Sequence, residues 1–168
     1  MNLFSELFSL FSVVTFPNEQ CTGTSSTSSL TNYGTCYSSS ECTNKGGKMD
    51  GNCAAGFGVC CTFLISSCGS TADQNCTYIQ NPSYPSSYST SGTCSYSIQP
   101  VNSEICQLRL DMDLFDITET TVGACTDSFD VTVGSSRAYY TLCGTLTGQH
   151  SKFLQTHSVV FGHFCGQF

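Results

Sequence analysis

Charged residues are scarce in this chain, and basic residues are the scarcest. Only 10% of its residues are charged, and five lysines and arginines stand against twelve acidic residues, which gives a formal net charge of −7 at pH 7. The basic residues are scattered: Lys45, Lys48, Arg109, Arg137 and Lys152. Because a phosphate backbone is bound by clustered positive charge, we expect no nucleic-acid partner. The same lack of cationic surface weakens the alternative of a cysteine-rich toxin that attacks anionic membranes.

Long apolar segments and common catalytic motifs are also missing. Beyond residue 20, no segment has the apolar length that crossing a bilayer requires, so we expect no membrane insertion of the mature chain. The sequences Gly-Asp-Ser-Gly, His-Glu-x-x-His and Gly-x-Ser-x-Gly do not occur. These absences favour a protein that is not an enzyme.

The N-terminal segment is the exception to the polar composition. Residues 1–16 contain an apolar stretch of signal-peptide length ahead of Pro17 and Cys21, although no basic residue precedes it and no small-x-small cleavage site follows. An amphipathic helix is the alternative, because most of its apolar side chains fall on one helical face. Because the cysteine content calls for export, we interpret residues 1–20 as a secretory signal peptide.

Cysteine is far above ordinary usage, at thirteen residues in 168. Thiols at this density persist as structure only where disulfides form and are not reduced, so the sequence predicts a secreted, extracellular protein. The positions are Cys21, Cys36, Cys42, Cys53, Cys60, Cys61, Cys68, Cys76, Cys94, Cys106, Cys125, Cys143 and Cys165.

Their spacing predicts two modules. Residues 21–66 contain six closely spaced cysteines and little apolar material, so crosslinks must hold this module together, and the residue pattern alone leaves their pairing open. Within it, residues 22–31 form a Ser/Thr tract that we interpret as a loop, with an O-glycosylated stretch as the alternative. A domain boundary is expected near Ser66.

Short strands follow the boundary. Residues 107–113 alternate between apolar and polar side chains, which is typical of a half-buried strand, and further strands are expected at 95–98, 129–133 and 138–142. Several such strands at short spacing predict an all-β antiparallel sandwich.

Particular residues make this region resemble a CUB domain, an extracellular two-sheet sandwich that serves mainly in protein and carbohydrate recognition. Cys68-Gly69, Asn81-Pro82-Ser83-Tyr84-Pro85 and Cys94-Ser95-Tyr96-Ser97-Ile98 match its opening, first turn and an early strand. Residues 108–117 match its core strand, and Cys125 with Cys143-Gly144 closes its second loop. The resemblance implies the disulfides Cys68–Cys94 and Cys125–Cys143, and we predict that the two remaining cysteines, Cys76 and Cys106, form a third.

The first module resembles the clip-type disulfide knots of arthropod secreted proteins, in a group where such a knot precedes a CUB domain. That resemblance implies the pairs Cys21–Cys60, Cys36–Cys53 and Cys42–Cys61. The CUB resemblance ends near residue 150 of a predicted domain at 67–168. Residues 151–168 lack recognisable closing strands, so either residues 158–164 replace them irregularly or the chain is a truncated or alternatively spliced product. Cys165 is left over, as a candidate for an intermolecular bridge.

Acidic residues gather between positions 104 and 130, where they would suit a cation or a basic partner: Glu104, Asp111, Asp113, Asp116, Glu119, Asp127 and Asp130. Many CUB domains bind calcium, and the resemblance implies that Glu119 and Asp127 would be ligands here. Both are displaced by one residue from the family's positions, so a solvated acidic face is the favoured interpretation.

Two further site predictions follow from motifs. Asn75-Cys76-Thr77 is an N-glycosylation sequon, which a disulfide at Cys76 would restrict. His150, His157, His163 and Cys165 match no zinc template, so we interpret them as polar tail residues.

The sequence therefore predicts a secreted, non-catalytic module that binds an extracellular protein or glycan, with no cofactor unless calcium binds. Its aromatic contacts are expected to come from Tyr78, Tyr84, Tyr88 and Tyr139. The alternative is the regulatory N-terminal region of a secreted CUB-containing protease, because clip-like knots and CUB domains both accompany such enzymes.

Overall fold

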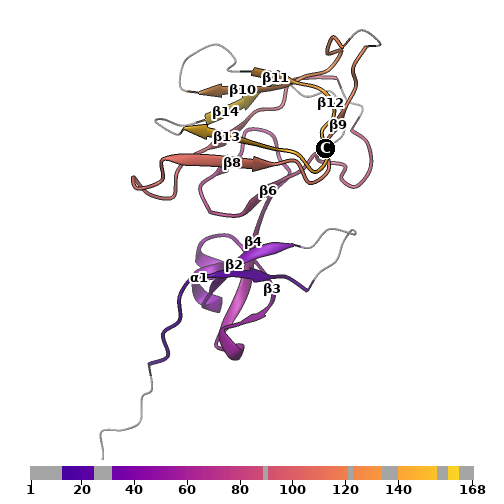
Figure 1. Cartoon of the computed structure of the whole chain (residues 1–168). Helices are drawn as coiled ribbons and strands as arrows, with labels where there is room; N and C mark the ends of the chain where they lie inside the picture. The colour runs from indigo at the N-terminus through magenta and orange to yellow at the C-terminus, as the bar shows by residue number, and fades with distance from the viewer. Residues whose placement is uncertain are drawn as a thin grey trace, which may run out of the picture.

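A computed structural model describes residues 13–24, 32–88, 91–120, 123–133, 140–154 and 159–162 of the chain. Nearly all regular structure in these residues is β, as predicted. A small disulfide-rich sheet formed by the N-terminal residues lies beneath a larger β-sandwich, as Figure 1 shows. No helix in the described part of the chain is long and apolar enough to span a bilayer.

The N-terminal module is a twisted antiparallel sheet with one short helix. Its strands lie in the order β1-β2-β4-β3 and are β1 (Gln20–Thr22), β2 (Tyr33–Tyr37), β3 (Lys48–Cys53) and β4 (Gly58–Ile65). Helix α1 (Ser39–Asn44) joins β2 to β3, and a 3₁₀ turn, η1 (Ala54–Gly56), joins β3 to β4. Ser38 and Glu41 form a capping box at the start of α1, in which the side chain of each accepts a hydrogen bond from the backbone N–H of the other. The hydrogen bond from the Ser38 side chain lowers the pKa of the Glu41 carboxyl.

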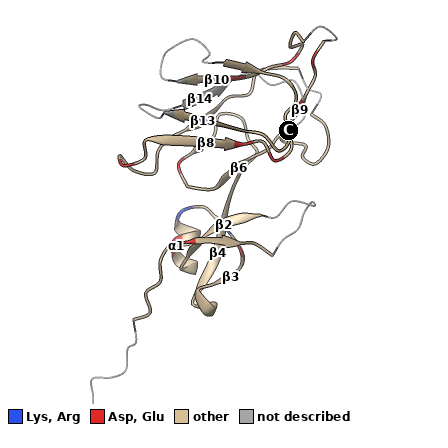
Figure 2. Cartoon of the chain, viewed as in Figure 1, with Lys and Arg blue, Asp and Glu red and all other residues tan. Residues whose placement is uncertain are grey.

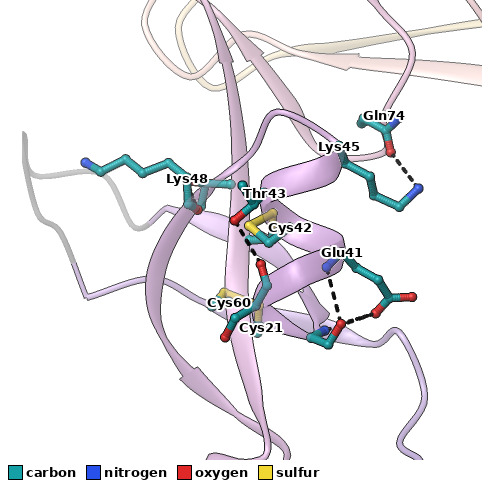
Figure 3. The surroundings of a disulfide bond; sticks show 12 residues. Cys21, Glu41, Cys42, Thr43, Lys45, Lys48, Cys60 and Gln74 are labelled. Carbon is teal, nitrogen blue, oxygen red and sulfur yellow. Dashed lines mark hydrogen bonds between the residues drawn. A yellow bond between two sulfur atoms is a disulfide. The ribbon is translucent and has the colours of Figure 1, made fainter.

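Sulfur atoms form much of the interior of this module. Cys42 and Cys61 are fully buried and bridged to each other, and they pack with Tyr37 and Phe63. At Gly47 a Cβ would clash with Cys61 Sγ and lie 2.8 Å from a Phe63 ring carbon, so this position is too close to the disulfide for any side chain. Figure 3 shows Cys42 on α1 and the nearby Cys21–Cys60 bridge.

The end of the expected signal peptide takes part in this module. Gln20 pairs with Thr35 in the β1–β2 ladder, and the Glu19 carbonyl accepts a hydrogen bond from the Cys36 N–H at 2.8 Å. A Cβ on Gly58 would lie 2.9 Å from the Phe16 ring, so Phe16 also packs against the sheet. Residues 16–20 therefore contribute contacts to the fold, whereas residues 1–12 lie outside the described part of the chain.

The sandwich has one continuous sheet and a second layer of paired strands (Figure 1). The continuous sheet has the order β11-β10-β14-β7-β5, with β5 (Thr71–Ala72), β7 (Tyr96–Ile98), β10 (Phe129–Val133), β11 (Tyr140–Leu142) and β14 (Val159–Gly162). The second layer contains the antiparallel pairs β8–β13 and β9–β12, with β8 (Gln107–Asp111), β9 (Asp116–Ile117), β12 (Gly144–Thr145) and β13 (His150–Leu154).

The core of the sandwich lies between these layers and takes side chains from both. Tyr96 and Val131 come from the continuous sheet, whereas Ile117 and Phe153 come from the second layer. Burial along β8 alternates as the sequence predicts, since Leu108 and Leu110 are half-buried while the residues between and beside them are exposed. The predicted strands at 95–98, 129–133 and 138–142 correspond to β7, β10 and β11.

The C-terminal residues supply closing strands, so the expectation that residues 151–168 lack them is wrong. β13 pairs with β8 over five residues, from His150 opposite Asp111 to Leu154 opposite Gln107. β14 lies between β10 and β7 and pairs with both. Sequence reasoning missed these strands because β13 begins with the polar run His150-Ser151-Lys152, which shows little apolar alternation. Cys165 lies outside the described residues.

The two modules are joined by strand pairing as well as by the chain itself. β6 (Thr77–Ile79) runs parallel to the end of β4, with Phe63 opposite Thr77 and Ile65 opposite Ile79. Ile65 and Ile79 both pack against the sandwich core. The boundary predicted near Ser66 therefore falls at the end of a strand that serves both modules.

Candidate functional site

One group of loops in the sandwich carries exposed carboxylates on a constrained backbone. Phe115 anchors it, because its ring is buried and its N–H donates to Thr147 Oγ1 at 2.9 Å. The Leu146 N–H donates to the Phe115 carbonyl at 3.1 Å. With Phe115 turned into the core, the residues on either side of it, Leu114 and Asp116, are exposed.

The β9–β12 pair positions the next two carboxylates. Asp116 lies opposite Thr145, whose hydroxyl donates to Asp116 Oδ1 at 3.1 Å. Glu119 reaches over Gly144, where an added Cβ would lie 2.9 Å from Glu119 Oε2. Gly144 also has φ of +80°, a conformation that other residues adopt only with strain. Glycine is therefore required at the point where the Glu119 carboxylate crosses the β12 backbone.

A disulfide fixes the loop that follows Glu119. Cys125 is bridged to Cys143, the residue before β12, and Cys125 also forms an isolated β-bridge with Glu119. The Asp127 N–H donates to the Thr118 carbonyl at 3.3 Å, which ties both ends of the loop together. We call the exposed surface of these loops the acidic loop surface and define it by Leu114, Asp116, Glu119, Asp127 and Thr145.

The structure brings Glu119 and Asp127 onto the same loop, but no third His, Cys, Asp or Glu among the described residues joins them. No three His, Cys, Asp or Glu side chains of the described residues converge to hold a metal ion. Calcium takes six to eight oxygens, and this pair supplies few of them. The zinc interpretation that the sequence disfavoured gains no support, because His157, His163 and Cys165 lie outside the described residues.

The other acidic residues of the predicted cluster are engaged locally or lie apart. Asp111 forms an exposed ion pair with Arg109 at 2.7 Å, which raises the pKa of the guanidinium. Asp130 accepts hydrogen bonds from Ser128 and Thr141. Partial desolvation, and then the nearby Asp111 charge, raises the pKa of the exposed Asp113 carboxyl. Figure 2 shows acidic segments in the loops of the sandwich.

Of the tyrosines predicted as aromatic contacts, Tyr78 is engaged within the chain. Tyr78 belongs to the junction between the modules, where its phenol oxygen accepts the Tyr33 N–H at 2.7 Å. Tyr84 and Tyr88 are half-buried beside the turn at residues 82–85, and Tyr139 lies outside the described residues. What the sequence did not reveal is Leu114, whose side chain is 44% exposed among the acidic loops. Its exposure could have been predicted from its position beside Phe115, because neighbouring residues of an extended segment face opposite ways.

Comparison with protein families gives a match for this sandwich. A family model described as the CUB domain matches residues 68–167, which is more than half of the chain. The chain belongs to the CUB domain family. No curated protein and no solved structure matched it. The match reaches residue 167, so the CUB domain includes the β13 and β14 strands that sequence reasoning had left outside.

The CUB domain and the module before it contain five disulfides among the described residues. They are Cys21–Cys60, Cys36–Cys53 and Cys42–Cys61 in the N-terminal module, and Cys68–Cys94 and Cys125–Cys143 in the CUB domain. These are the pairs that the two resemblances implied.

The expected third CUB bridge is absent, which corrects the prediction for Cys76 and Cys106. Both thiols are free in the structure. Cys76 lies in the turn before β6 with φ of +57°, and Thr35 of the N-terminal module is close enough to influence the pKa of its thiol. Cys106 is exposed immediately before β8. Pairing by elimination failed because Cys76 faces the other module.

Proposed function

We propose that this chain is a secreted, non-catalytic binding module that recognises an extracellular protein or glycan. The observation that carries the proposal is the CUB domain at residues 68–167, built on a disulfide-bridged scaffold. CUB domains commonly act as extracellular binding modules. Structural disulfides persist mainly in oxidising compartments, which supports export.

The acidic loop surface is the recognition surface that we assign to this domain. Binding interfaces combine apolar anchors with a polar rim, and Leu114 with Asp116 and Glu119 provides that combination. The β9–β12 pairing and the Cys125–Cys143 bridge hold these side chains in place before binding, which reduces the entropy that binding costs. Its negative charge favours a basic protein over a glycan, because neutral sugars gain nothing from carboxylate charge.

The origin and context of the module are part of the same proposal. The pairs Cys21–Cys60, Cys36–Cys53 and Cys42–Cys61 support a clip-like module of the arthropod secreted type. A clip-like knot beside a CUB domain also suits the regulatory region of a secreted protease. Peptide mapping of the native secreted protein distinguishes the two contexts, since a protease would yield peptides from a linked catalytic domain.

Binding is tested with the full chain, immobilised and exposed to extracellular fluid and to a glycan array. Partners recovered on the chain are then measured against it and against the variant D116N/E119Q. For a basic protein we expect the dissociation constant of the variant to be at least tenfold larger than that of the native chain. We also expect the association rate of the native chain to fall as the salt concentration increases. The control is Glu104→Gln, which removes an exposed carboxylate from a separate loop.

Two results count against the proposal. If neither protein nor glycan binds the native chain above a disulfide-scrambled control, the binding function is wrong. If a partner binds the native chain and D116N/E119Q equally, the binding function stands but the acidic loop surface is the wrong site.

A further inference from the structure

The turn between β5 and β6 contains the sequon Asn75-Cys76-Thr77, in which Asn75 is exposed. The Thr77 hydroxyl donates to the Gln74 carbonyl at 2.7 Å, and Cys76 adopts a left-handed conformation. These two features fix the local conformation of the turn. An N-glycan is a bulky, soluble group that a surface loop can carry without disturbing the core.

The disulfide that would have restricted this sequon does not form. Cys76 remains a thiol that is half-buried near Thr35 of the N-terminal module. Burial raises the pKa of this thiol, so less of it is present as the thiolate that oxidises. The residue inside the sequon is therefore turned toward the N-terminal module while Asn75 faces solvent.

The chain supplies its own comparison in Asn81-Pro82-Ser83. Here proline occupies the middle position, which excludes a sequon. Asn81 is also only 2% exposed, and its Oδ1 accepts the Ser83 N–H at 2.7 Å. Of the two Asn-x-Ser/Thr sequences in the chain, only the one at Asn75 satisfies both the sequence rule and the need for an exposed acceptor.

We propose that Asn75 is the N-glycosylation site of this protein and that the glycan covers the edge of the junction between the modules. The donor is a lipid-diphosphate-linked oligosaccharide. Asn75 Nδ2 attacks C1 of its first sugar, the C–N bond forms, the C1–O bond to the diphosphate breaks, and Nδ2 loses one proton as the lipid diphosphate leaves. No oxidant or reductant takes part.

The position of Asn75 gives this glycan a consequence for recognition. The preceding residue, Gln74, accepts a hydrogen bond from Lys45 of the N-terminal module at 3.4 Å, as Figure 3 shows. Two residues after Asn75, Thr77 lies opposite Phe63 of β4. A glycan at Asn75 therefore begins where the modules meet, and its bulk keeps a large partner away from that edge.

The test is expression of the full chain in insect cells, once from its own N-terminus and once behind a supplied secretion leader. Secreted protein is treated with peptide N-glycosidase, and the peptide containing Asn75 is identified by mass spectrometry. We expect one enzyme-sensitive shift in gel mobility and aspartate at position 75 after release. The shift should disappear completely in Asn75→Gln and Thr77→Val, and persist in Thr77→Ser and Ser83→Ala.

An unmodified Asn75 peptide in folded, secreted wild-type protein overturns the proposal, and so does a shift that survives in Asn75→Gln. The inference depends on export, which belongs to the proposed function. Expression with and without the supplied leader separates a failure of export from a failure of the Asn75 site. A chain glycosylated only behind the supplied leader retains the Asn75 site and argues against secretion from its own N-terminus.

Discussion

The backbone N–H of Tyr33 in β2 donates to the phenol oxygen of Tyr78 in β6, with an N···O distance of 2.7 Å. This hydrogen bond crosses from the N-terminal module to the CUB domain. It lies beside the parallel β4–β6 pairing and the contact between Lys45 and Gln74. The junction is thus built from backbone and side-chain contacts of both modules.

Removing the Tyr78 hydroxyl should weaken this junction. We expect Tyr78→Phe to lower the free energy of unfolding by about 1 kcal/mol, because the Tyr33 N–H loses its acceptor. Denaturant unfolding followed by circular dichroism measures the change. Tyr33→Phe is the matched control, because the hydrogen bond uses the backbone of Tyr33 and survives that substitution. Equal losses in the two variants would contradict this account.

Separating the modules should destabilise the CUB domain. A fragment of residues 67–168 loses the β4 partner of β6 and the Ile65 side chain that packs against the core. It leaves an unpaired strand edge and exposed apolar surface, so we expect a lower Tm and stronger binding of a hydrophobic dye than for residues 13–168. If the fragment has the same Tm as the CUB domain within residues 13–168, the two modules are independent.

Two disulfides with nearly equal loops separate the effect of crosslinking from that of burial. Cys42–Cys61 has a sequence separation of 19 and Cys125–Cys143 one of 18. By restricting the unfolded chain, each bridge should therefore stabilise the folded protein by about 3 kcal/mol. Of these four cysteines, only Cys42 and Cys61 are fully buried. We expect C42A/C61A to lose roughly 2 kcal/mol more than C125A/C143A in chemical unfolding, because it also leaves a cavity. Similar losses would mean that the buried sulfurs add nothing as core atoms.

The pKa of Asp113 gives a pH-dependent prediction. Because partial desolvation and the Asp111 charge raise this pKa in the folded state above the ordinary value of 3.8, the folded protein binds the proton more tightly than the unfolded chain. Stability from this group is therefore present below pH 3.8 and is lost as the pH rises through the folded-state pKa.

We accordingly expect Asp113→Asn to raise the Tm at pH 7 and to leave it close to wild type below pH 3.8. Thermal unfolding across this range measures the difference, with Glu104→Gln as the control. A constant Tm difference at all pH values would show that ionisation of Asp113 is not its cause.

Sequence patterns predicted β7, β8, β10 and β11 of the CUB domain, because these strands show local alternation of apolar and polar residues. Leu108, Leu110 and Met112 recur at every second position, and this period places them on one face in any half-buried strand. β14 escaped detection because it is completed by neighbours on both sides, β10 and β7, that are distant in the chain.

The candidate site was only partly visible for the same reason. Sequence reasoning identified Glu119 and Asp127 but could not reveal that Glu119 crosses Gly144 or that Asp116 faces Thr145, since both contacts depend on the register between β9 and β12. It paired Cys76 with Cys106 by elimination, whereas the fold directs Cys76 toward Thr35.

The sequence by itself determined that this is a disulfide-rich β protein, because cysteine content and two-residue periodicity act locally along the chain. The tertiary structure alone decided which cysteines remain free, which acidic residues share a surface and how the modules meet. Those features depend on pairing between strands far apart in sequence, such as β4 with β6 and β9 with β12, and no local pattern specifies that register.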